Sequence, residues 1–123
     1  MVLTSQAQLI LEENFDNYNS REYIAVQSPN FETWNYAQGT TEDAFISDTF
    51  SLSSPNSLHI EGFNGPTDVV LVFPSAYTTG VYDISMDLYL VPGNGAYFNL
   101  QESAVFGQVW NLEMYFSSND VAT

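Results

Sequence analysis

The chain has no cysteine and no lysine, and Arg21 is its only basic residue apart from a single histidine. The lack of cysteine excludes disulfides, thiolate metal sites and cysteine nucleophiles. Fifteen acidic residues against this one arginine give a formal net charge of -14 over 123 residues. The chain is therefore not expected to bind nucleic acid or anionic membranes, and Arg21 is expected to pair with one of the many carboxylates. Such a field attracts cations, although a merely solvated acidic surface is the plainer interpretation.

Long apolar runs and catalytic motifs are lacking as well. No stretch approaches the roughly 20 apolar residues of a membrane-spanning helix, so membrane insertion is not expected. The G-x-S-x-G elbow, the phosphate-binding loop and the dinucleotide fingerprint are absent. Glycoside hydrolases carry two carboxylates at alternate positions of one strand, whereas Asp83 and Asp87 lie four positions apart and Glu113 has no acidic neighbour two positions away. We therefore expect no catalysis, and His59 alone predicts no zinc site.

What the sequence does contain is enough apolar material for one folded domain. Apolar residues make up 45% of the chain and aromatic residues 15%, so burial can offset the loss of chain entropy. The dominant pattern is an alternation of apolar and polar residues, which is typical of half-buried antiparallel strands. The longest alternating segments, which we expect to form adjacent strands of one sheet, are Val81–Leu90, Ala96–Gln101 and Val109–Phe116.

The alternation in the last of these segments directs Trp110, Leu112 and Met114 into a core. At most one short helical turn is expected, for example within Asn17–Val26, because no segment has apolar residues at helical spacing. Strands separated by turn-forming residues predict an all-β fold, an antiparallel β-sandwich or a barrel. Shorter strands are expected at Leu9–Glu12, Ala44–Ser47, Ser57–Glu61 and Asp68–Phe73.

The two ends of the chain carry separate expectations. Residues 1–8 look like the tail of a secretory signal around its cleavage point, with a frayed terminus as the alternative. The domain proper is then 9–123. Val121–Thr123 would begin a further strand, so either the final strand is very short or the chain is one portion of a longer domain.

Short segments spread over nearly the whole chain carry a family resemblance. They are Glu13–Asp16, Ser28–Trp34, Glu42–Ala44, Ser47–Asp48, Asn56–Gly62, Gly65–Leu71, Gly95–Gln101 and Trp110–Glu113. Together they resemble the jelly-roll domains, similar to concanavalin A and laminin G sandwiches, of secreted Bacteroidetes proteins that use the type IX secretion route. The resemblance implies a secreted or cell-surface location and a jelly roll that extends beyond this chain. Another chain or a swapped copy is then expected to complete the sandwich.

The outward face of the three late strands is the first candidate site. Tyrosine rings stack on the apolar faces of sugars, while amides and carboxylates form hydrogen bonds with sugar hydroxyls. This mixture predicts a glycan or cell-surface polysaccharide as ligand, and a solvated sheet face is the alternative. The candidate ligand-binding residues are Asp87, Tyr89, Tyr97, Asn99, Gln101, Asn111, Glu113 and Tyr115.

Acidic loops near the early strands form the second candidate site. Calcium takes six to eight oxygen ligands from carboxylates and backbone carbonyls, and similar jelly rolls often hold a structural calcium ion. The spacing matches no EF-hand loop, so a solvated acidic loop is the alternative. The candidate metal ligands are Glu13, Asp16, Glu42, Asp43 and Asp48.

Two functions therefore follow from the sequence and the resemblance. The first is a non-catalytic carbohydrate-binding or adhesion module of a secreted or cell-surface protein. The second is a structural or assembly module, stabilised by calcium and without a glycan ligand. Both functions are what the resemblance to β-sandwiches implies, and this architecture hosts unrelated activities.

Overall fold

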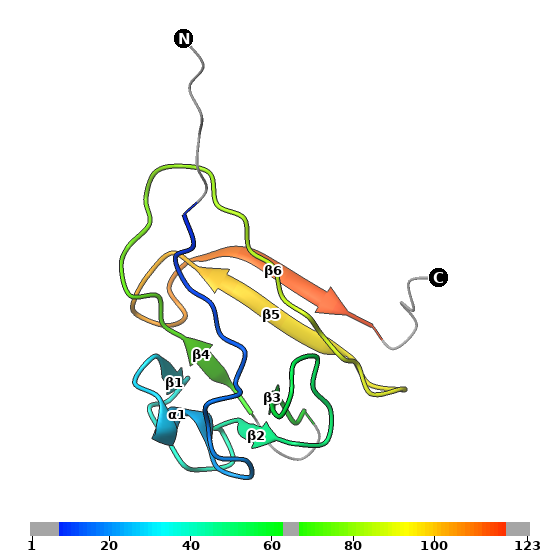
Figure 1. Ribbon diagram of the computed structural model, residues 1–123. Helices are drawn as coiled ribbons and strands as arrows, with labels where there is room; N and C mark the ends of the chain where they lie inside the picture. Colours follow the sequence, from blue (N-terminus) through cyan, green and yellow to red (C-terminus); the bar gives the residue numbers. More distant parts are fainter. Residues whose placement is uncertain (1–7, 63–66, 118–123) are drawn as a thin grey trace.

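The computed structural model describes residues 8–62 and 67–117, and its regular structure is almost entirely β-strand (Figure 1). The strands form three separate two-stranded antiparallel sheets, β1–β4, β2–β3 and β5–β6. This confirms the expected strand-rich class, but the described residues show no sandwich and no jelly roll. In chain order the elements are α1 (Ile24–Gln27), β1 (Phe31–Thr33), β2 (Phe45–Ser47), β3 (Ser57–His59), β4 (Val69–Leu71), β5 (Ala96–Gln101) and β6 (Trp110–Phe116).

The core lies where α1 meets the two short sheets. Ile24 of α1, Phe31 of β1, and Ala44 and Ile46 at β2 are buried and form one cluster. Burying an Ile or Phe side chain stabilises a fold by about 1.5–3 kcal/mol, so Ile24, Phe31 and Ile46 contribute most of this cluster's stabilisation. The cluster ties a helical turn to strands from two different sheets, so it is the centre of the first half of the chain.

Asp43 is a buried carboxylate beside this core, with 1% of its surface exposed. Its Oδ1 accepts the backbone N–H of Ala25 at 3.2 Å and that of Ala44 at 2.8 Å, and its Oδ2 accepts the N–H of Gly39 at 3.0 Å. A buried carboxylate is stable only when such donors replace its hydration. Asp43 therefore fixes α1 and the 39–44 loop against the start of β2.

β5 and β6 form the longest ladder and extend away from the core (Figure 1). The register pairs Tyr97 with Tyr115 and Leu100 with Leu112, and then shifts so that Gln101 pairs with Trp110. Aromatic stacking connects the hairpin to the turn after β1. The ring centroids of Trp34 and Trp110 are 6.5 Å apart, and those of Trp34 and Phe106 are 5.9 Å apart; Tyr36 also stacks on Phe106 at 5.3 Å.

Several expected elements are confirmed. The expected strand at Ala96–Gln101 has the bounds of β5, and the one at Val109–Phe116 differs from β6 by one residue. Shorter strands within Ala44–Ser47, Ser57–Glu61 and Asp68–Phe73 correspond to β2, β3 and β4, and the single helical turn is α1.

Two expected strands are wrong. Val81–Leu90 and Leu9–Glu12 contain no strand, although the first alternates as a strand should. Alternating apolar and polar residues favour an extended segment with one apolar and one polar face. A strand also needs a neighbouring strand that forms hydrogen bonds with its backbone N–H and C=O groups. Neither segment has such a ladder among the described residues.

The inward direction of the β6 side chains is also wrong. Trp110 is 45% exposed, Leu112 40% and Met114 38%. The described part of the chain supplies no second layer over the β5–β6 hairpin that would bury them. A separate finding concerns membrane spans: within residues 8–62 and 67–117, no helix has the length and apolar character needed to cross a membrane. The signal remnant, except Gln8, and the strand expected from Val121 lie outside the described residues.

Candidate functional site

Tyrosine and amide side chains share one face of the β5–β6 hairpin. Residues that pair across an antiparallel ladder point to the same side, and alternate residues along each strand do so too. The register thus groups two cross-strand pairs, Tyr97 with Tyr115 and Asn99 with Glu113. We call this surface the tyrosine face, and it comprises Tyr97, Asn99, Gln101, Glu113 and Tyr115.

The carboxylate of Glu113 organises the two tyrosines. Its Oε1 accepts the hydroxyl of Tyr97 at 3.0 Å and that of Tyr115 at 3.3 Å. The two rings lie 4.6 Å apart at an interplanar angle of 37°. Desolvation of the hydroxyl and then the hydrogen bond to Glu113 raise the pKa of Tyr97 above the ordinary 10.0.

The amides of the tyrosine face are held in a similar way. Gln101 donates from Nε2 to Oδ1 of Asn99 at 3.0 Å, and its Oε1 accepts the backbone N–H of Gly107 at 2.8 Å. The second contact connects the face to the loop that joins β5 and β6. Two aromatic rings and three polar groups are thus presented on one rigid ladder.

Three of the expected ligand-binding residues are not among those that define this face. Asn111 falls at the register shift, where Gln101 pairs with Trp110 instead, so it has no partner in the ladder. Asp87 lies exposed in the segment that forms no strand. Tyr89 belongs to the same segment and stacks on Phe50 with 4.6 Å between ring centroids.

The five expected metal ligands do not converge. Within residues 8–62 and 67–117, no group of three or more His, Asp or Glu side chains is placed to hold a metal ion. Glu42 accepts the backbone N–H of Asn35 at 2.6 Å, and Asp43 is bound to backbone amides as described above. These two carboxylates therefore hold loops in place.

The other three carboxylates also have protein partners. Glu13 accepts the N–H of Phe15 at 2.8 Å, and Asp16 accepts the N–H of Asn56 at 3.2 Å. Asp48 forms an ion pair with Arg21, 3.9 Å from Nη2 to Oδ2, as expected for the single arginine. Calcium binding stays a prediction from the sequence.

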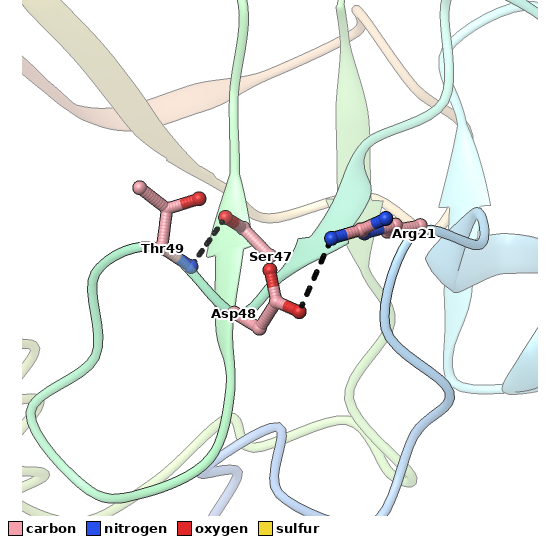
Figure 2. Close-up of polar contacts among 4 residues, drawn as sticks. All are labelled: Arg21, Ser47, Asp48 and Thr49. Atoms are coloured by element: carbon pink, nitrogen blue, oxygen red, sulfur yellow. Dashed lines mark hydrogen bonds and ion pairs between the residues drawn. The ribbon is translucent and has the colours of Figure 1, made fainter.

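A second site was not expected from the sequence. An open hollow of about 270 Å³, which we call the Arg21 hollow, lies along β2. Arg21 and Asp48 point toward each other across it, beside Ser47 and Thr49 (Figure 2). Its lining also includes His59, so the only arginine and the only histidine of the chain meet at one place.

No protein-family model, curated protein or solved structure matches this chain.

Proposed function

We propose that the chain is a non-catalytic carbohydrate-binding or adhesion module of a secreted or cell-surface protein, and that the tyrosine face is its binding surface. The observation that carries the proposal is the pair of exposed rings, Tyr97 and Tyr115, held side by side by the Glu113 carboxylate. A protein surface that exposes two tyrosines on a rigid ladder offers stacking area without a large loss of side-chain entropy on binding.

The chemistry of the face favours an uncharged glycan. Each ring can stack on one sugar, and Asn99, Gln101 and Glu113 supply acceptors and donors for the hydroxyl groups around it. The chain carries a net charge of -14, which repels anionic polysaccharides at low ionic strength. A neutral oligosaccharide avoids this repulsion.

The test is binding to an array of neutral oligosaccharides, followed by titration of any glycan that binds. Tyr97→Ala and Tyr115→Ala are each expected to weaken binding by roughly 3- to 10-fold, the size of one aromatic contact. Tyr82→Ala is the matched control, because Tyr82 is an exposed tyrosine outside the hairpin. A glycan that binds both variants and the unchanged chain equally would show that the tyrosine face is not the binding surface.

The second candidate function is a structural or assembly module in which another strand-bearing chain, or a second copy, completes a β-sandwich. The opposite face of the hairpin favours it, because Phe98, Leu100, Leu112 and Met114 share that side and two of them are exposed. Exposed apolar sheet faces mark interaction surfaces.

Light scattering across a range of concentrations tests the second function. Assembly through the apolar face is expected to raise the mass, and Leu112→Ser with Met114→Ser is expected to return it to that of one chain. Measurements with added calcium and with a chelator report whether a metal ion supports assembly. A single-chain mass at all concentrations and in all these conditions counts against the assembly function.

A further inference from the structure

The Arg21 hollow contains groups of opposite charge on segments that are distant in the sequence. Arg21 precedes α1, whereas Asp48 follows β2, and a single contact of 3.9 Å joins them. The Arg21 side chain is 84% exposed and that of Asp48 is 47% exposed. A guanidinium has five N–H donors, so most of the donors of Arg21 are available to a ligand.

The backbone holds Arg21 in this place at a conformational cost. Its φ of 66° is in the left-handed region, which residues other than glycine rarely adopt. Two hydrogen bonds to Ile46 impose this conformation. The N–H of Arg21 donates to Ile46 O at 2.7 Å, and Ile46 N–H donates to Glu22 O at 2.9 Å. A strained residue fixed by its neighbours, at the edge of a hollow, is a recurrent feature of binding sites.

Charge decides which ligand the hollow can take. A purely anionic ligand is repelled by the net charge of -14, and a purely cationic ligand finds many other carboxylates. A molecule with both charges has no net charge and matches Arg21 and Asp48 together. The volume of about 270 Å³ is slightly below the range of roughly 300–1,000 Å³ for drug-sized ligands, so the molecule is small.

We propose that the Arg21 hollow binds a small zwitterion of the α-amino-acid type. The ligand carboxylate binds the guanidinium of Arg21, and the ligand ammonium binds the carboxylate of Asp48. The Phe45 ring lines the hollow and provides an apolar contact for the ligand side chain. Tyr23 stacks on this ring, with 4.2 Å between the ring centroids. This site is independent of the tyrosine face.

Nuclear magnetic resonance of the isotope-labelled chain tests the proposal, because the side-chain signals of Arg21 and His59 are each unique in this sequence. The probe is L-leucine, compared with isocaproate and isopentylamine, which keep the same side chain and only one of the two charges. L-Leucine is expected to shift the Arg21 and His59 signals to saturation. Each analogue is expected to bind at least roughly 10-fold more weakly, because one charge-assisted contact is lost.

Variants then assign the two contacts. Arg21→Gln and Asp48→Asn are each expected to weaken L-leucine binding by roughly 10-fold, followed through the His59 signal. Asp87→Asn makes the same charge change in an exposed segment outside the hollow and is expected to leave the affinity unchanged. The backbone amide spectrum of each variant checks that the chain remains folded. Equal affinity for all three compounds, no saturable shift, or affinity unaffected by both variants would overturn the proposal.

Discussion

The carboxylate of Asp43 accepts the backbone N–H of Ala25, a residue 18 positions earlier in the chain, at 3.2 Å. The same carboxylate binds the amides of Gly39 and Ala44. Its position between α1 and β2 adds to the antiparallel bridge between Tyr23 and Phe45, which joins the same two segments. Asp43 was expected from the sequence as a metal ligand, and the structure gives its oxygens to backbone amides instead.

Asp43→Asn is expected to lower the free energy of unfolding by about 1.5–3 kcal/mol, because an amide loses charge-assisted bonds and turns a donor toward N–H groups. Urea unfolding followed by tryptophan fluorescence measures this change. The control is Asp87→Asn, an equal charge change at an exposed position. Equal stability of the two variants would mean that Asp43 does not anchor the fold.

Gly107 is expected to tolerate no side chain. Its φ is 77°, and a Cβ there would lie 2.9 Å from Cζ2 of Trp34. Gly93 has a similar φ of 86° and no atom within 4 Å of such a Cβ, so it isolates the backbone effect. Gly93→Ala should cost about 1 kcal/mol, and Gly107→Ala a further 1–3 kcal/mol, roughly, from overpacking. Thermal unfolding of both variants measures the difference, and equal losses would exclude a packing role for Gly107.

The pH dependence of stability should report on Asp68. Desolvation of the carboxyl and then the charge of Glu42 raise the pKa of Asp68 above its ordinary value of 3.8. Between 3.8 and the raised pKa, the unfolded chain ionises this carboxyl before the folded chain does, so its contribution to stability is lost as pH rises through that interval. Asp68→Asn is expected to reduce this fall, measured by urea unfolding at a series of pH values. Asp83→Asn is the control, because it makes the same charge change in the segment 81–90, which forms no strand. An identical effect of both variants would contradict the assignment.

Ser20 offers a stabilising substitution. Its Oγ is buried, and no hydrogen-bond partner for it exists within the described parts of the chain. Ser20→Ala is therefore expected to raise the free energy of unfolding by about 1 kcal/mol. Ser28 is the counterpart, since its Oγ accepts the Tyr18 hydroxyl at 3.2 Å, and Ser28→Ala should lower stability by a similar amount. A loss of stability in Ser20→Ala would indicate that the hydroxyl has a partner in solution.

Structural features encoded by neighbouring residues could be predicted from the sequence, whereas features that depend on contacts between distant segments could not. β5 and β6 were predicted because alternation over six or seven residues is a local signal. The pairing of β1 with β4 was not predicted. Each strand has only three residues, which give little periodicity, and Phe31 pairs with Leu71, which is distant in the sequence. The segment 81–90 was mistaken for a strand because alternation carries no information about a hydrogen-bonding neighbour.

The candidate sites divide in the same way. The alternation of side chains along the two strands predicted that Tyr97, Glu113 and Tyr115 lie on one side of the sheet. The register confirms this grouping. The register shift that leaves Asn111 without a ladder partner has no signature in the residue pattern. The Arg21 hollow depends on a left-handed backbone and on a contact between Arg21 and Asp48, and neither follows from alternation.

The lack of a shared ladder between the three sheets has a mechanical consequence. Ring stacks at Trp34 are prominent among the contacts that connect the β5–β6 hairpin to the core, and stacked rings separate one contact at a time. Under tension applied between the two halves, the hairpin should peel away at low force and return when released. The half anchored by Asp43 should yield later, in a separate and more abrupt step.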